Sequence, residues 1–444
     1  MRVGLIAVSG VRVVNERLVR LGVTLPGFVE RARVIASMPS LGLLTLAAVT
    51  PPEYDVSYVE CPELDADALA SRDFDIVAVS SFTAKADVMY AIADFYRARG
   101  TTVVLGGLHC TLLPDEAATH ADAVVVGEGE LLWPRVLDDW RAGRLQRVYR
   151  NGSFQDVALG DRPVPRYDLL DPAAYNRFPI QTSRGCPLDC EFCAASKIFG
   201  GYKRKPIEQV ARELAAIATV AKHPFVELAD DNTFVEKRWS RQLVATLAAA
   251  QVHWFTETDV SVAEGPSLLD ALADSGCRQV LIGFESPDRE SLAGIEAHDW
   301  KARQHGRYLR AIDEVQRRGV SVNGCFILGL DQHTPDVFSA VERFVKASGL
   351  MEVQVTVLTP FPGTALYRRL RAEGRLLREQ YWDRCTLFDV NYRPKRMSVE
   401  DLEQGLEYLM GALYTAQEVE RRRRLYLDAV LDKRRNRSCT VPAT

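Results

Sequence analysis

Short apolar runs alternate with amphipathic stretches over the first 150 residues. Runs rich in Val and Ile are each separated from the next by a helix-like segment: RVGLIAV, DVSYVEC, FDIVAVS, TVVLGG and DAVVVG. Such runs are typical of buried strands, and strands that alternate with helices predict a parallel, doubly wound sheet. We therefore expect an α/β domain with a Rossmann-like sheet over residues 1–150.

A second alternating series follows a segment of different composition. Residues 151–176 are rich in Gly, Pro, Asp and Arg, which is typical of a linker. Beyond it lie further strand candidates, each followed by a helical pattern: FPIQTS, FVELAD, HWFTET, QVLIGF, VNGCFILG and EVQVTVLTP. Six strand–helix units predict a partial (β/α)6 barrel over residues 177–375, with its chemistry at the carboxyl ends of the strands.

The strand pattern ends near residue 376, and the sequence predicts a helical domain over residues 376–444. The basic stretch RRRRLYLDAVLDKRRNR is one that RNA or a membrane surface could bind. Because Glu418, Glu420, Asp428 and Asp432 accompany it, we interpret it as a solvated helix face. Cys385 follows the predicted barrel directly, where it either lies near an active site or is simply buried.

Composition narrows the class of protein. The chain has 444 residues, 47% of them hydrophobic and 26% charged, with a formal net charge of -4. This balance gives no reason to expect nucleic acid or acidic lipid as the main partner. The longest apolar stretches are well short of the roughly 20 residues of a membrane helix, and the N-terminus lacks the features of a secretory signal. We expect a cytoplasmic protein without a transmembrane segment.

The cysteines provide the first chemical signal. Disulfides are not expected in the cytosol, and six of the nine cysteines are scattered singly. The other three, Cys186, Cys190 and Cys193, form a C-x3-C-x2-C pattern in TSRGCPLDCEFC, directly after a predicted strand. Three thiolates on one loop can hold three corners of an iron–sulfur cluster. The fourth iron would keep an open position, as catalytic metal sites do for their substrates.

This motif resembles the signature of the radical S-adenosylmethionine (SAM) superfamily, in which the residue before the last cysteine is commonly aromatic, as Phe192 is. The resemblance implies a [4Fe-4S] cluster that binds SAM and cleaves it to a radical able to abstract hydrogen from an unactivated carbon. It identifies no catalytic side chain. A zinc knuckle is the alternative, but no His or Cys within twenty-five residues downstream of Cys193 offers a fourth ligand.

Other segments between residues 177 and 375 resemble the SAM-contact positions of that superfamily, in the same order along the chain. The resemblance implies that a carboxylate after the second strand pairs with the SAM ammonium group, that a glycine-containing fifth strand admits the adenosine, and that the turn after the sixth lies near the adenine. The candidate contacts are Asp230, Asp231, Asn232, Glu257, Ser261, Glu285, Ser286, Leu328 in GCFILGL and Pro360 in TPFPGT. Each alone would more often be a helix cap or a turn.

The N-terminal segments PSLGLLTLAA, VSSFT, GGLH and VVVGEGE resemble those of cobalamin (B12)-binding domains. The resemblance implies a slot for the nucleotide tail of cobalamin, with candidate contacts Ser80, Ser81, Thr83, Gly106, Gly107, His109, Gly127 and Glu128. The Asp-x-His-x-x-Gly motif that supplies a cobalt-ligating histidine in many such domains is absent. His109 is then a candidate ligand, with a hydrogen-bonded loop histidine as the favoured interpretation. A doubly wound sheet that has lost cobalamin, or that binds another ligand, is the alternative for the whole domain.

Taken together, the motifs resemble the B12-dependent radical SAM family that includes hopanoid methylases and the anaerobic magnesium-protoporphyrin ester cyclase. That resemblance implies methyl transfer to an unactivated carbon of a small molecule, a lipid or a tetrapyrrole, with flavodoxin or ferredoxin as electron donor and no nucleic acid partner. Oxidation, cyclisation or ring rearrangement with the same cofactors remains open. A zinc-stabilised RNA-binding protein is the alternative of another class, but it would leave the barrel motifs unexplained. Methylthiolation of tRNA is disfavoured, because the related radical SAM family that performs it carries a second cysteine triad in its N-terminal domain. Here only Cys61 and Cys110 precede the linker.

Overall fold

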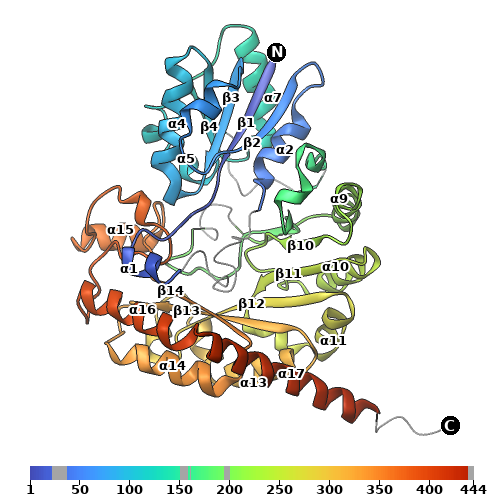
Figure 1. The fold of residues 1–444 in the computed structure, drawn as a ribbon, viewed down its shortest axis with the longest axis vertical. Coiled ribbons are helices and arrows are strands. Elements are labelled where there is room, and N and C mark those ends of the chain that lie inside the picture. Colours follow the sequence, from blue (N-terminus) through green and yellow to red (C-terminus); the bar gives the residue numbers. More distant parts are fainter. Residues whose placement is uncertain (23–37, 151–158, 161, 195–200, 439–444) are drawn as a thin grey trace, which may run out of the picture.

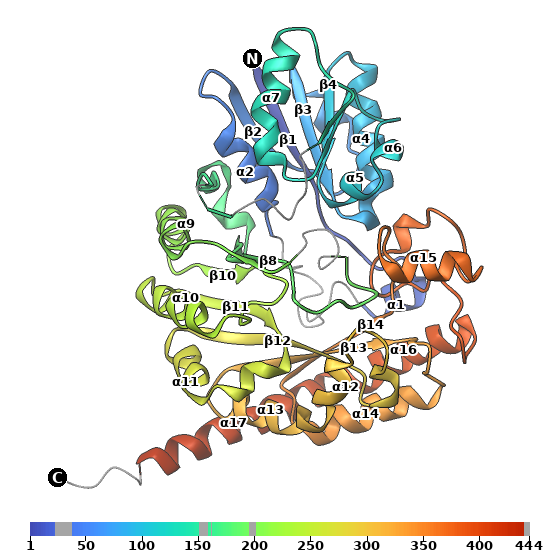
Figure 2. The same ribbon diagram turned by 180° about the vertical axis from the view of Figure 1, so that it is seen from behind.

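The computed structural model describes residues 1–22, 38–150, 159–160, 162–194 and 201–438, with side chains as far as Leu431. Part of the predicted linker, at 151–158 and 161, lies outside the described residues. The predicted α/β class is confirmed: two six-stranded parallel sheets are followed by helices. Figures 1 and 2 show the two sheets in separate halves of the molecule, with the first sheet above the second along the long axis.

The first sheet has the strand order β2-β1-β3-β4-β5-β6, and all of its pairings are parallel. Its strands are β1 (Arg2–Val8), β2 (Asp55–Glu60), β3 (Ile76–Ser81), β4 (Thr102–Gly106), β5 (Ala123–Val126) and β6 (Val148–Arg150). The strand β1, which lies between β2 and β3, packs Val3 and Leu5 into one core and Ile6 into another, on the opposite face. A strand covered on both faces carries a continuous apolar run, which is the pattern that the sequence shows.

Helices cover both faces of this sheet. The helices α2 and α7 pack together against one face, and α4 packs against the other. The helices of this half are α1 (Glu16–Arg20), α2 (Leu41–Val49), α3 (Ala66–Ala70), α4 (Ala86–Ala98), α5 (Leu108–Leu112), α6 (Pro114–Ala117) and α7 (Gly129–Arg141). The edge strand β6 was not expected from the sequence, because its three residues are too few to show an apolar pattern.

The second sheet runs β14-β13-β12-β11-β10-β7, so neighbours in the sheet follow the order of the chain. Its strands are β7 (Phe178–Ile180), β10 (Phe225–Leu228), β11 (His253–Thr258), β12 (Cys277–Glu285), β13 (Ser321–Leu328) and β14 (Glu352–Val357). The strands β7 and β14 are its two edges, which makes it the predicted partial barrel. A short antiparallel pair, β8 (Ser183–Arg184) with β9 (Lys203–Arg204), follows β7.

Helices flank the barrel on its outer side and extend beyond it (Figure 1). They are α9 (Ile207–Val220), α10 (Lys237–Ala249), α11 (Pro266–Asp274), α12 (Trp300–Gln304), α13 (Tyr308–Gln316), α14 (Asp336–Ser348), α15 (Ala365–Ala372), α16 (Val399–Leu413) and α17 (Ala416–Ser438). Short 3-10 helices are η2 (Thr83–Lys85), η4 (Tyr167–Leu169), η5 (Pro172–Ala174), η6 (Val260–Glu264), η7 (Glu290–Leu292), η8 (His305–Arg307) and η9 (Trp382–Arg384).

The helix α17 carries the basic stretch and projects from the body towards the C-terminus (Figure 1). Its Arg422 is buried and donates hydrogen bonds to the backbone oxygens of Leu413 and Met351, at 2.6 and 3.3 Å. The first turns of the helix are thereby fastened to the barrel. Among the described helices, none combines the length and the apolar character needed to cross a membrane.

Each sheet has, in its core, side chains from the part of the chain that forms the other sheet or follows it. Val13 and Leu18, which follow β1, are buried in the core of the second sheet, and the Asp389 carboxylate accepts the backbone N–H of Val14 at 2.9 Å. In the other direction, Trp382 and Cys385 are buried in a core of the first sheet. Each core is therefore completed by residues from the other half of the chain, and Cys385 is a buried core residue.

Candidate active site

The three clustered cysteines lie on the loop that follows β8. Cys190 is buried, and Cys186 and Cys193 are half-buried. Burial, with smaller contributions from the neighbouring Glu285 carboxylate and the Cys193 and Cys186 thiols, raises the pKa of Cys190 to about 12. The three thiols lie on one short loop, and this soft donor set fits a cluster that binds thiolates. Phe192, between the last two cysteines, packs against the core of the second sheet.

Asp230, Asp231 and Asn232 contact the cluster loop or the strand pair that leads into it. The Asp231 carboxylate accepts the backbone N–H of Gly185 at 2.7 Å, and the Asn232 amide donates to the Cys186 sulfur at 3.8 Å. Gly185 has φ 82°, a left-handed conformation that favours glycine. The three polar residues predicted after β10 therefore hold the backbone that leads into the first cysteine.

Asp230 is buried and accepts several hydrogen bonds. Its carboxylate accepts the backbone N–H groups of Thr182 and Ser183, at 2.7 and 2.9 Å, and the Thr233 hydroxyl at 3.0 Å. Burial raises the pKa of Asp230, and these hydrogen bonds oppose that shift. This carboxylate, predicted to contact SAM, is used inside the protein to join β7 and β8 to the end of β10.

Glu257 lies among other carboxylates on the second sheet. Its side chain is exposed at the surface. Desolvation by the surrounding protein is the largest effect on its pKa, and repulsion from the Glu227, Asp231 and Glu285 carboxylates is the next; together they raise the pKa of Glu257 to about 8. Ser261, the other candidate after β11, lies in η6, where its backbone N–H donates to Asp259 at 2.8 Å. The structure thus places Glu257 on an open wall of carboxyl groups, where a cationic ligand would favour its ionised form.

Asp259 was missed by the sequence analysis. Its carboxylate accepts hydrogen bonds from the Asn232 amide at 2.7 Å and from Ser261, and so connects two predicted site residues. The only signal for it was its position two residues after Glu257, which many capping residues share.

Glu285 ends β12 in an unusual backbone conformation. Its φ is 62°, and its carboxylate forms a buried ion pair with Lys301 at 2.6 Å. Lys301 also donates to the Gly283 carbonyl at 3.2 Å, and its positive charge lies near the Cys190 thiol. Lys301 was missed because it stands alone in EAHDWKAR, without a pattern that predicts a buried cation.

Ser286 is paired with a buried histidine. The Ser286 hydroxyl lies 3.1 Å from His333 Nε2, while His333 Nδ1 accepts the backbone N–H of Leu330 at 3.3 Å. Burial lowers the pKa of His333 to about 4. The neutral imidazole therefore links the ends of β12 and β13.

Acidification is expected to weaken this link. The pKa of His333 in the folded protein, about 4, lies below its ordinary value of 6.5, so the stabilisation is present above pH 6.5 and is lost as the pH falls through about 4. That shift corresponds to about 3 kcal/mol in the free energy of unfolding. The free energy of unfolding, measured in urea, should fall between pH 7 and pH 4 in both proteins compared. The fall should be larger in the wild type than in His333→Gln by about this amount. The matched control is His298→Gln, at an exposed histidine, unfolded at the same two pH values.

Leu328 and Pro360, the candidates at the last two strands, are both buried. The Leu328 carbonyl accepts the backbone N–H of Leu358 at 2.9 Å. A side chain at Gly329, which has φ +86°, would meet the Tyr392 hydroxyl oxygen at 2.1 Å. Packing against Tyr392 therefore accounts for a glycine in this segment.

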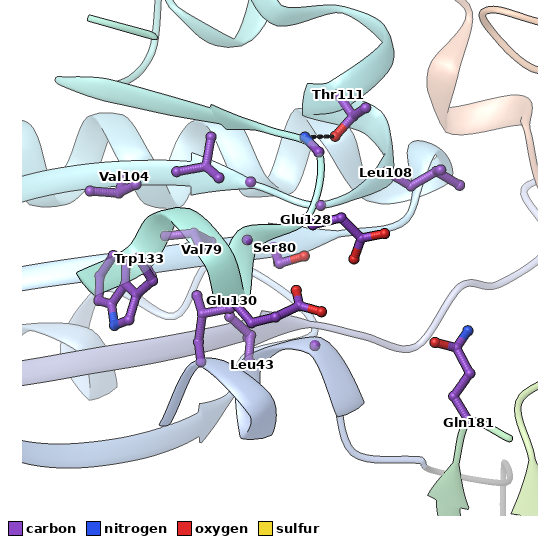
Figure 3. Close-up of a pocket in the computed structure, with 18 of the residues that line it drawn as sticks. Leu43, Val79, Ser80, Val104, Leu108, Thr111, Glu128, Glu130, Trp133 and Gln181 are labelled. Atoms are coloured by element: carbon purple, nitrogen blue, oxygen red, sulfur yellow. Dashed lines mark hydrogen bonds between the residues drawn. The ribbon is translucent and has the colours of Figure 1, made fainter. Parts of the chain in front are cut away.

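A cavity of about 190 Å³ opens at the carboxyl edge of the first sheet (Figure 3). It is lined by the predicted residues Ser80, Gly106, Gly107, Gly127 and Glu128, and by apolar residues that include Leu43, Leu46, Val79, Val104, Leu108, Val125 and Trp133. A Cβ atom at Gly107, where φ is +93°, would lie 2.4 Å from the Ser80 hydroxyl oxygen. Glycine thus keeps the slot open, and its apolar walls with a polar mouth fit a flat aromatic group such as the base of a nucleotide tail.

Ser81, Thr83 and His109 point elsewhere. The Ser81 hydroxyl donates to the Met89 sulfur at 3.3 Å. His109 is fully buried, with Nδ1 3.3 Å from the Thr83 hydroxyl and Nε2 3.0 Å from the Tyr90 hydroxyl and 3.3 Å from a Glu116 oxygen. Both ring nitrogens thus have protein partners, as the interpretation of a hydrogen-bonded histidine requires.

An ion pair connects the cavity to the strand that leads into the cluster loop. Arg184 lies two residues before Cys186, and its guanidinium forms an ion pair with Glu128 and donates from Nε to the Gln181 side chain at 2.9 Å. Arg184, Gln181 and Glu128 all line the cavity, which Figure 3 shows for Gln181 and Glu128. The carboxyl edges of the two sheets therefore meet where the two predicted sites adjoin.

Family models match both halves of the chain. The radical SAM superfamily matches residues 180–345, a B12 binding domain matches 31–137, and a domain of unknown function, DUF4070, matches 364–441. The first match includes the three cysteines, and the second spans the predicted cobalamin contacts.

Curated relatives align over most of the chain. The bacteriochlorophyllide d C-12(1)-methyltransferase of Chlorobaculum tepidum is 26% identical, over 87% of this chain and 84% of the relative. The hopanoid C-2 methylase of Rhodopseudomonas palustris is 27% identical, over 78% of this chain and 67% of the relative.

A solved structure shares the fold. The radical SAM methyltransferase TsrM from Kitasatospora setae, with cobalamin and a [4Fe-4S] cluster bound, has a TM-score of 0.65 at 16% identity, covering 84% of this chain and 78% of that chain. The family matches assign a [4Fe-4S] cluster, SAM and cobalamin to this chain. The protein is therefore a radical SAM enzyme that combines a radical SAM domain with a B12-binding domain, and it is similar to B12-dependent radical SAM methyltransferases.

Proposed function

We propose that the enzyme transfers a methyl group to an unactivated carbon of a small molecule. The observation that carries the proposal is the Arg184–Glu128 contact, which brings the edge of the cobalamin cavity to within two residues of the first cluster cysteine. When bound, the cluster and SAM supply a radical that abstracts hydrogen, and cobalamin supplies the methyl group. The names of the bacteriochlorophyllide and hopanoid relatives support methyl transfer.

Individual residues have separate tasks in this proposal. The thiolates of Cys186, Cys190 and Cys193 hold the cluster, while Asp230, Asp231 and Asn232 fix the backbone that carries it. On the open wall, Glu257 faces the ammonium or sulfonium group of SAM. Ser80, Gly106, Gly107 and Gly127 hold the nucleotide tail, and Glu128 closes its mouth.

The substrate class and the electron donor also belong to the proposal. The named substrates of the relatives are tetrapyrrole-type and hopanoid compounds, which favour an extended lipid or tetrapyrrole. An external flavodoxin or ferredoxin supplies the electron. We assign residues 1–150 to the cobalamin domain, 151–176 to a linker, 177–375 to the barrel and 376–444 to the helical domain, since the first sheet ends at Arg150 and the second begins at Phe178.

A reaction without methyl transfer is the second candidate. The anaerobic magnesium-protoporphyrin IX monomethyl ester cyclase of Rubrivivax gelatinosus is 23% identical, over 60% of this chain and 53% of the relative. Such a cyclisation, like an oxidation or a ring rearrangement, would use the same cofactors.

Two coproducts distinguish the candidates. Loss of the methyl group converts SAM to S-adenosylhomocysteine, whereas reductive cleavage yields methionine and 5′-deoxyadenosine. We expect the reduced enzyme, loaded with cluster and hydroxocobalamin, to form both from SAM. Formation of 5′-deoxyadenosine alone would favour the cyclase-like reaction. Formation of neither by enzyme that holds all its cofactors would contradict both candidates.

Filling the cavity is expected to prevent cobalamin binding. In Gly106→Val, the new Cβ has ordinary contacts, 3.7 Å from Val125, and the added methyl groups occupy the slot. Retention of hydroxocobalamin, near one equivalent in the wild type, should fall by about tenfold, which is about 1.4 kcal/mol in binding free energy. Iron content should not change. Gly411→Val, at an exposed position on α16 with open space around it, is the control and should retain the wild-type amount.

A further inference from the structure

A second ion-pair network reaches the cluster loop at Glu191. Glu191 lies between Cys190 and Phe192, and its carboxylate accepts two hydrogen bonds from Arg369 of α15. The distances are 3.1 Å from Nε to Oε2 and 2.7 Å from Nη2 to Oε1. Both side chains are about two-thirds buried or more, with 27% and 30% exposed. Paired hydrogen bonds of this kind fix the orientation of a carboxylate as well as its distance.

Arg369 is itself held from the other side. Its Nη1 donates to Asp331, just after β13, at 2.8 Å, and Asp331 also accepts from Arg375 at 3.0 Å. Glu373 lies 3.4 Å from the same guanidinium. Hydrogen bonding to Glu191 raises the pKa of Arg369, so the guanidinium is charged at every relevant pH. The network therefore presents a fixed cation to the middle of the loop.

The backbone of Glu191 is fastened independently of its side chain. Its N–H donates to the Ile295 carbonyl at 3.0 Å, and its carbonyl accepts the N–H of Leu366 at 2.9 Å. These bonds survive a change of the Glu191 side chain. A substitution of Glu191 or Arg369 thus tests the ion pair without removing the backbone attachments.

We propose that the Glu191–Arg369 pair is a positioning device that orients the loop between the second and third cysteines for cluster binding. The inference rests on the proposed assignment of the cluster to Cys186, Cys190 and Cys193. Neither residue touches the reacting groups; each acts through the loop that carries the ligands. Partners that orient metal ligands in this way commonly change metal affinity by roughly 10–100-fold when they are removed.

The test compares Arg369→Lys, Arg369→Gln and Glu191→Gln with the wild type. Lysine keeps the charge but loses the planar fork, so it should not restore the pair. We expect loss of iron to a chelator to be about tenfold faster in all three variants, with a broadened electron paramagnetic resonance signal from the reduced cluster. The control is Arg371→Lys on the same helix, where the arginine makes a similar two-bond contact, 2.9 and 3.2 Å, with the exposed Glu379.

The double variant Glu191→Gln/Arg369→Gln should lose iron no faster than Arg369→Gln alone, because that variant already removes the contact with Glu191. Additive effects would overturn the inference, as would iron loss at the wild-type rate. A matching fall in the melting temperature of the cluster-free protein would also overturn it, since the role would then be general stability. If the wild type itself held no cluster, the proposed function would fail, which separates the two results.

Discussion

Replacement of Cys190 by alanine is expected to abolish SAM cleavage. Cys190 is the buried member of the triad, and removal of one thiolate leaves two corners of the cluster on the protein. Because the cluster carries the reductive step, formation of 5′-deoxyadenosine should fall by at least roughly 10³-fold. Iron and sulfide per chain, and 5′-deoxyadenosine formed with dithionite as reductant, measure the two effects.

Cys277→Ala is the matched control for that experiment. Cys277 is also buried, but it begins β12, and its thiol contacts only the Gln279 carbonyl, at 3.6 Å, among the hydrogen bonds described. This variant should bind a full cluster and cleave SAM at the wild-type rate. Normal SAM cleavage by Cys190→Ala would refute the assignment of the cluster to this loop.

Among the substitutions predicted here, removal of the Asp230 carboxylate should lower the free energy of unfolding the most. In Asp230→Ala, the buried N–H groups of Thr182 and Ser183 lose their acceptor, and so does the Thr233 hydroxyl. Each buried group left without a partner costs about 1–3 kcal/mol, so we expect the free energy of unfolding to fall by about 3–5 kcal/mol. Asp230→Asn keeps one acceptor oxygen and should lose less. Urea unfolding of the cluster-free variants measures the difference.

The exposed Asp336, in the first turn of α14, provides the comparison for Asp230. Asp336→Ala removes only a favourable charge near a helix N-terminus, so its effect should stay within about 1 kcal/mol. Equal losses from the two variants would show that the hydrogen bonds of Asp230 contribute nothing beyond an ordinary surface charge.

The sequence predicted those features whose signal is local. The cysteine spacing, the apolar runs of the central strands and the glycines of the cavity each lie within a few adjacent residues. Arg369, Lys301 and Asp259 could not be found in this way. Arg369 meets Glu191 across 178 positions, and a single arginine on a charged helix gives no sign of such a partner.

His109 lies one residue beyond the part of its motif that lines the cavity. It follows the cavity glycines in GGLH, and the next position after Gly107, Leu108, does line the cavity. Gly107 is the N-cap of α5, however, so Leu108 and His109 are the first two residues of a helix, where successive side chains point about 100° apart. His109 is consequently turned towards Tyr90 and Glu116, and the slot is lined one turn later by Thr111.

The core side chains that each half takes from the other limit how modular this enzyme is. A chimaera joined at residues 151–176 would transplant Val13 and Leu18 away from the barrel core that they fill, and would leave Trp382 behind, whose indole donates to Glu116 at 2.9 Å. Both halves of the graft would then expose apolar surface at the seam. A cobalamin-binding unit that can be moved to another protein therefore includes the segment around Trp382 as well as the first 150 residues. We expect the two halves of the enzyme to have been inherited together.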